Sequence, residues 1–138
     1  MPLSEIHSMD HVRQACDYTG MRFGTILPTD IDAFIDFQNR LFIFIEAKYH
    51  GKELPLGQRL ALERICDGQK VRSFVLVVSH ERRSGESIIL AETDVVKYRY
   101  RGRWITPERP YTCREMVDEI CSRYLGVRVP AIREVCDE

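Results

Sequence analysis

Residues 28–48 read PTDIDAFIDFQNRLFIFIEAK, and this stretch decides the fold. Between Thr29 and Phe37, apolar and polar residues alternate, which is typical of a strand with one face in the core. The apolar face carries Ile31, Ala33, Ile35 and Phe37, and the opposite face carries Asp30, Asp32, Phe34 and Asp36. We therefore predict a strand with an acidic side.

The run from Leu41 to Tyr49 is almost continuously apolar, as expected of a central strand covered on both faces. Glu46 and Lys48 interrupt it, and the two-residue period of a strand points both side chains to one face. Buried there, each charge costs several kcal/mol of desolvation unless it is compensated. The two residues are either a structural ion pair or part of a functional site, and charges kept in such a place favour function.

The turn between the two strands sets which acids meet. A three- or five-residue turn centred on Asn39 places residue 32 opposite residue 46, whereas a two-residue turn would put the acids on opposite faces. Opposed side chains have β-carbons about 5 Å apart, so Asp32 and Glu46 could share one divalent cation. Without a cation the two carboxylates would repel each other.

A helix is predicted after this hairpin, with Pro55 in its first turn and an end at Asp67, before Gly68. Gln58 falls on the apolar side of this helix with Leu62 and Ile65. An inward glutamine needs a partner. It either reaches the water or phosphate of the carboxylate site, or hydrogen-bonds a loop carbonyl.

An Asp on one strand, Glu-x-Lys near the end of the next and a glutamine on the following helix resemble the PD-(D/E)XK nuclease superfamily. The spacing is similar to that of the archaeal Holliday junction resolvases. The resemblance covers about residues 28–67 and implies metal ligands at Asp32 and Glu46, a catalytic lysine at Lys48 and a helix glutamine at Gln58. Asp30 competes with Asp32 as ligand, because the family's Pro-Asp pair is spread here over residues 28–32. The glutamate that many members place on a first helix has no clear counterpart except Glu5.

Further elements complete the predicted fold. An apolar strand over 71–79 follows the helix and would run parallel to the strand 41–49, giving a mixed sheet. We also predict a helix over 4–19, a short edge strand over 20–27, a strand from Ile88 to Ala91, and a helix from a Thr112–Glu115 capping box to Leu125. The expected fold class is α/β, and the resemblance implies a restriction-endonuclease-like mixed β-sheet core flanked by helices, in a single domain over 1–138.

Residues 95–104 are rich in basic and aromatic side chains. As one strand, the segment would place its cations on one face and its rings on the other. The cations are Lys97, Arg99, Arg101 and Arg103, and the rings are those of Tyr98, Tyr100 and Trp104. Such a row could follow a phosphate backbone and bind nucleic acid. The alternative is a solvated edge strand whose charges prevent aggregation.

Composition limits the class of protein. The chain has 138 residues, 44% hydrophobic and 30% charged, which suits one globular domain. Its five cysteines are an odd number without a C-x-x-C pair, which argues against a disulfide framework or a zinc ribbon and for a cytoplasmic protein.

His7 and His11 lie four residues apart, but no third ligand is spaced to join them. We expect no membrane span. The net charge of −1 means that any DNA binding must rely on a local basic patch.

The resemblance implies a Mg²⁺- or Mn²⁺-dependent endonuclease that acts on DNA. It also implies a possible homodimer, because many of the junction-cutting members of the family act as dimers. Two alternatives remain open at this point. The chain could be a non-catalytic module that binds nucleic acid or protein on the same fold. It could also be a metal-dependent phosphoesterase for small nucleotides, whose activity high salt would hardly change.

Overall fold

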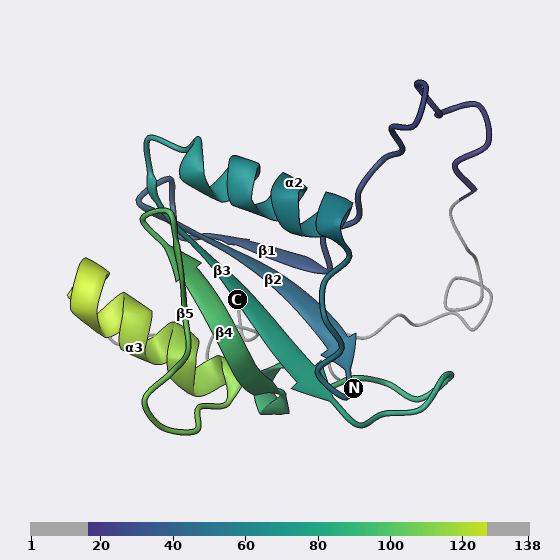
Figure 1. Cartoon of the computed structure of the whole chain (residues 1–138). Helices are drawn as coiled ribbons and strands as arrows, with labels where there is room; N and C mark the ends of the chain where they lie inside the picture. Colours follow the sequence, from purple (N-terminus) through teal and green to yellow (C-terminus); the bar gives the residue numbers. More distant parts are fainter. Residues whose placement is uncertain (1–16, 127–138) are drawn as a thin grey trace. The chain divides into compact units, whose positions relative to one another are not determined.

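A computed structural model describes residues 17–126 of the chain. Residues 30–126 belong to one compact unit, and residues 17–29 belong to another. In the first of these, five strands lie side by side in the order in which they occur in the sequence, and the sheet carries a helix on each face (Figure 1). This confirms the α/β class and the mixed sheet. The single domain over 1–138 stays a prediction.

The predicted hairpin is present with the predicted register. Strand β1 (Ala33–Asp36) pairs antiparallel with β2 (Leu41–Tyr49), and Ala33 faces Ile45. The turn is centred on Asn39, whose φ is 61°, and the Asp36 carboxylate accepts a hydrogen bond from the Asn39 N–H. The strand predicted over 29–37 is shorter than expected. Before Ala33 the ladder ends, because the Asp32 side chain takes over the Ala47 N–H.

The crossover that follows is parallel, as predicted. Helix α2 (Leu56–Asp67) leads from β2 into β3 (Arg72–His80), and β3 pairs parallel with β2 along its whole length. Strands β4 (Asp94–Tyr100) and β5 (Arg103–Ile105) continue the sheet antiparallel. Helix α3 (Cys113–Leu125) begins at the predicted capping box of Thr112 and Glu115 and ends at Gly126, whose φ is 67°.

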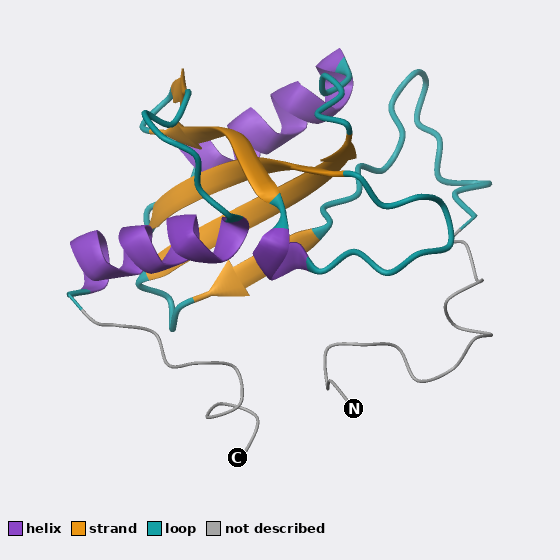
Figure 2. Ribbon diagram, turned by 90° about the horizontal axis from the view of Figure 1, so that it is seen from below, coloured by secondary structure: helices purple, strands orange, loops and turns teal. Residues whose placement is uncertain are grey.

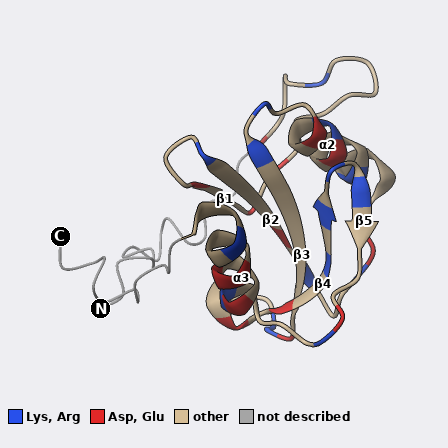
Figure 3. Cartoon of the chain, turned by 90° about the vertical axis from the view of Figure 1, so that its left-hand side faces the viewer, with Lys and Arg blue, Asp and Glu red and all other residues tan. Residues whose placement is uncertain are grey.

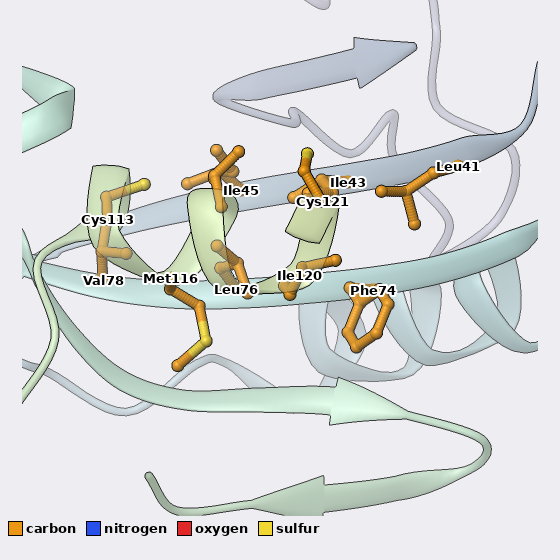
Figure 4. Packing of buried hydrophobic residues seen from close by; sticks show 11 residues of the cluster. Leu41, Ile43, Ile45, Phe74, Leu76, Val78, Cys113, Met116, Ile120 and Cys121 are labelled. Carbon is orange, nitrogen blue, oxygen red and sulfur yellow. The ribbon is translucent and has the colours of Figure 1, made fainter. Parts of the chain in front are cut away.

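Figure 2 shows the sheet between the two helices, so the unit has three layers and two apolar cores. Under α3, one face of β2 and β3 packs against the helix, with Leu76 and Cys121 fully buried (Figure 4). Under α2, the opposite face of the same strands packs against Leu62 and Cys66. Covering both faces explains why β2 and β3 are apolar almost throughout.

Two predicted strands are absent from the described residues. Residues 20–27 do not form an edge strand: Phe23 and Ile26 bond to each other across a tight turn in which Gly24 has a φ of 68°. The strand predicted from Ile88 is also absent, because a short 3₁₀ helix, η1 (Leu90–Glu92), leads directly into β4. The helix predicted over 4–19, with Glu5, His7 and His11, lies outside the described residues except for residues 17–19, which are not helical.

The basic segment 95–104 is a hairpin and not one strand. Arg101 and Gly102 both have positive φ, 51° and 74°, and reverse the chain between β4 and β5. Trp104 therefore pairs opposite Arg99 and packs into the core under α2, whereas Tyr98 and Tyr100 pack into the core under α3. The prediction that four cations share one face and three rings the other is wrong.

Arg99 is a structural residue of this hairpin. It is only 9% exposed, and its guanidinium donates to both carboxylate oxygens of Asp67 at 3.0 and 2.6 Å. A third nitrogen lies 3.8 Å from Glu63 Oε2, which also accepts from the Trp104 indole at 2.7 Å. A guanidinium held in this way is not available to bind a phosphate. We therefore no longer include Arg99 among the residues predicted to bind nucleic acid.

We predict that Arg99→Gln destabilises the fold. The substitution leaves Asp67 and Glu63 without the cation that pairs with them, and because Asp67 is exposed and Glu63 partly exposed, the cost should be about 2 kcal/mol. Arg103→Gln is the matched control, because Arg103 is exposed and surface substitutions usually change stability by less than about 0.5 kcal/mol. Urea denaturation of both variants measures the difference. Equal unfolding midpoints would show that the Arg99 ion pairs contribute nothing net.

Candidate functional site

The candidate site lies at the end of β2, on the face of the sheet that α2 covers. Phe44 is 4% exposed and lies in the core on this face, and Glu46 follows two residues later at 3% exposure. Lys48 is the next residue on the same face, and its side chain is 21% exposed. The strand therefore passes from the apolar core to solvent within three side chains, and Glu46 lies at the boundary.

Two cationic or polar groups hold one oxygen of Glu46. Gln58 Nε2 donates to Glu46 Oε2 at 2.7 Å, and Lys48 Nζ lies 3.4 Å from the same oxygen. Gln58 is in the first turn of α2 and donates to a buried carboxylate, so the inward position predicted for it is confirmed. The partner is the carboxylate itself and not a loop carbonyl.

The other oxygen of the carboxylate has no partner. Glu46 Oε1 is buried and makes no hydrogen bond. Leaving a buried charged acceptor unsatisfied costs free energy, and groups of this kind in native structures call for an explanation such as a bound ion. An oxygen available to a cation therefore lies inside the site.

Asp32 brings a second carboxylate to the same place. It is exposed, one residue before β1, and its Oδ2 accepts from the Ala47 N–H at 2.8 Å. This bond attaches Asp32 to β2 beside Glu46, as the register predicted. Asp30 lies two residues earlier and is also exposed. The geometry favours Asp32 over Asp30 as the ligand.

The pKa of Glu46 reflects its burial and the repulsion between its carboxylate and that of Asp32. Burial raises the pKa of Glu46, and the negative charge of Asp32 raises it further, while Lys48 and Gln58 act in the opposite direction. A divalent cation between the carboxylates would remove both causes, because it replaces lost hydration and neutralises the repulsion. Among residues 17–126, no three His, Cys, Asp or Glu side chains gather into a metal-binding cluster. The protein ligands here would be two carboxylates.

Of the other predicted site residues, Lys97 is nearest to this arrangement. It pairs with Val77 of β3, which in turn pairs with Glu46, so Lys97 and Glu46 lie in one row across the sheet. Its ammonium lies 4.7 Å from the centre of the Trp104 ring. Arg101 and Arg103 belong to the distant β4–β5 turn, so the structure does not bring them together with the carboxylates.

Sequence reasoning missed the acidic side of α2. Glu63 and Asp67 are four residues apart and receive the Arg99 guanidinium. Their i, i+4 spacing was a visible signal that this side of the helix could bind a cation from the sheet. The pairing of Arg59 with Glu63, which the same spacing predicts, is present at 3.6 Å.

We predict that Glu46→Gln stabilises the protein at neutral pH. A carboxyl with a raised pKa binds a proton more readily in the folded state, so folding stability falls as pH rises from the ordinary glutamate pKa through the raised value. Glutamine keeps an oxygen that accepts from Gln58 but never ionises. The gain should be on the order of 1 kcal/mol.

Thermal unfolding without divalent metal, followed from about pH 4 to about pH 8, tests this. The melting temperatures of the two proteins should be close at the acidic end and should separate as pH rises. A constant difference across the range would show that Glu46 does not titrate as its surroundings imply.

Comparison with protein-family models, curated proteins and solved structures finds no match for this chain. Within residues 17–126, no helix is long and apolar enough to cross a membrane. The functional assignment therefore depends on the side chains around Glu46.

Proposed function

We propose that the chain is a metal-dependent nuclease that hydrolyses phosphodiester bonds of DNA. One observation carries this proposal: Glu46 lies 3% exposed at the end of an apolar strand, and its buried Oε1 has no partner. A carboxylate that served only as the anchor of Lys48 and Gln58 would not need to bury a second, unsatisfied oxygen. A ligand for a cation does need one.

The residues present fit a hard divalent cation. Glu46 Oε1 and the exposed carboxylate of Asp32 would hold Mg²⁺ or Mn²⁺, since both ions prefer carboxylate oxygens and keep several waters. When bound, such an ion polarises a phosphate oxygen and lowers the pKa of a bound water. Asp30 remains an alternative ligand.

The remaining side chains have separate tasks. Lys48 is partly exposed beside Glu46, where its ammonium would bind a non-bridging phosphate oxygen and offset the charge that develops during hydrolysis. Gln58 fixes Glu46 Oε2 and leaves Oε1 without a hydrogen bond, so that Oε1 could bind the cation, and the Gln58 amide would help to position the attacking water. Lys97, in the same row of the sheet, would contact a neighbouring phosphate.

The openness of the site supports a polymeric substrate. Asp32 is exposed and Lys48 partly exposed, so the Asp32 carboxylate and the Lys48 ammonium are reached from the surface, whereas Glu46 Oε1 is buried beside them. An extended nucleic-acid strand needs such access, because its backbone must pass across the site. A cytoplasmic location and a homodimer stay predictions.

The test is cleavage of plasmid, linear duplex, single-stranded and four-way-junction DNA in Mg²⁺ or Mn²⁺. We expect wild-type protein to cut at least one of these. Glu46→Gln and Lys48→Met should each reduce the rate by about 10²-fold or more, the scale of losing one group that stabilises the transition state. Glu119→Gln is the matched control, since it makes the same chemical change on the exposed side of α3.

Metal binding has its own readout. Mg²⁺ should raise the melting temperature of wild-type protein and of Glu119→Gln, because a ligand that binds only the folded state stabilises it. It should have no such effect on Glu46→Gln. Wild-type protein that binds DNA but cuts none of the substrates in either metal would be a non-catalytic binding module, and the nuclease proposal would then be wrong.

A further inference from the structure

A strongly basic cavity lies at the end of α2 that is farther from Gln58. It has a volume of about 420 Å³ and lies between the loop after α2, the start of β3 and the β4–β5 turn. Three cationic side chains line it, together with smaller polar groups and a tyrosine. These lining residues are Lys70, Arg72, Arg101, Gln69, Ser73 and Tyr100. Figure 3 shows the basic segments of β3 and of the β4–β5 hairpin at the same end of the sheet.

The negative charge at this cavity is already neutralised. Asp67 also lines it, but both of its carboxylate oxygens accept hydrogen bonds from Arg99. The cavity therefore keeps an excess of positive charge although the whole chain has a formal charge of −1. An excess of this kind in a concave, partly desolvated place attracts anions.

Aromatic rings hold two of the cations in place. The Arg72 guanidinium lies 4.3 Å from the centre of the Tyr124 ring and donates a hydrogen bond to the Tyr100 hydroxyl. Arg101 lies 5.4 Å from the centre of the Tyr100 ring. Guanidinium groups fixed on aromatic faces lose little side-chain freedom when they bind a phosphate, and their planar donors suit its oxygens.

The turn that presents Arg101 is itself unusual. A two-residue hairpin turn with positive φ at both central positions strongly prefers Asn or Asp followed by Gly. This turn has Arg101 at the first position with a φ of 51° and Gly102 at the second. A side chain outside the preferred set is strained in the left-handed region, so Arg101 occupies this position against the local preference.

We propose that this cavity binds a backbone phosphate of the nucleic acid that the Glu46 site cleaves, several nucleotides away from the scissile bond. The proposal rests on the proposed function for the identity of the polymer. Gln58, at the Glu46 site, and Asp67, at the cavity, are in the first and last turns of α2. Nine residues of helix separate them by about 14 Å. Along β3, Val77 pairs with Glu46, and Arg72 lies five residues earlier, about 17 Å away at the end of the strand, where its side chain leaves the opposite face.

That separation defines the substrate class. Successive nucleotides of a duplex rise about 3.4 Å along the axis, so the two contacts span roughly four or five nucleotides. A mononucleotide or dinucleotide cannot reach both. The cavity would therefore distinguish polymers from small phosphate esters and add affinity without changing the chemistry at Glu46.

The experiment separates polymer binding from hydrolysis. Binding of fluorescently labelled 20-nucleotide single-stranded and duplex DNA is measured by anisotropy in EDTA at several salt concentrations. Arg72→Gln and Arg101→Asn are the test variants, and Arg101→Asn also suits the turn, so it should not lower stability. Arg83→Gln is the control, because it removes the same charge from the exposed loop after β3. Hydrolysis of bis(p-nitrophenyl) phosphate in Mn²⁺ reports the Glu46 site alone.

We expect each test variant to bind DNA roughly five- to tenfold more weakly than Arg83→Gln and to lower the slope of log affinity against log salt by about 1. Hydrolysis of the small diester should not change. DNA affinity and salt slope equal to those of Arg83→Gln would overturn the phosphate site, and so would a wild-type protein that does not bind DNA. Wild-type protein that binds DNA through these residues yet hydrolyses neither the diester nor DNA would support the phosphate site while the proposed nuclease function fails.

Discussion

The parallel pairing of β2 with β3 is the constraint on which the rest of the structure depends. Parallel strands need a long connection, which here contains α2, and they must be covered on both faces. Helix α2 covers one face and α3 the other, so both strands are apolar almost throughout. Against that background two charged residues at the end of β2 are costly, and the place where the apolar run is broken is the candidate site.

The site combines an electrostatic cost with a rigid support. Glu46 is buried beside a second acid, and burial and repulsion both raise its pKa. The strand that carries it is bonded on both sides, and Gln58 comes from a helix packed on the same core, so the backbone at Glu46 and one oxygen of its carboxylate are held in place. Sites that store unfavourable charge in this way lose stability in exchange for a ligand position prepared before the ligand arrives.

The basic residues of the last hairpin have two different uses. Arg99 lies inside the fold, where it joins the sheet to α2 through Asp67 and Glu63. Arg101 is two residues away in the sequence, but the turn carries it to a cavity that Arg72 and Lys70 also line. By bonding both oxygens of Asp67, Arg99 leaves that cavity positive. Arg99 thus neutralises Asp67, and the positive charge of Arg101 in the cavity stays uncompensated by that carboxylate.

Local patterns were enough to predict much of this protein. The alternation over 29–37, the apolar run over 41–49 and a turn centred on Asn39 determined the hairpin, its register and the meeting of Asp32 with β2, because side chains on a strand repeat every second residue. The capping box and the inward position of Gln58 followed from helical spacing in the same way. The prediction for segment 95–104 failed because Arg101 is not a residue typical of a left-handed turn, so Gly102 alone did not indicate that the strand reverses. Only the tertiary structure decided which oxygen of Glu46 has no partner and which arginines meet in a cavity. Both depend on contacts between residues that are far apart in the chain.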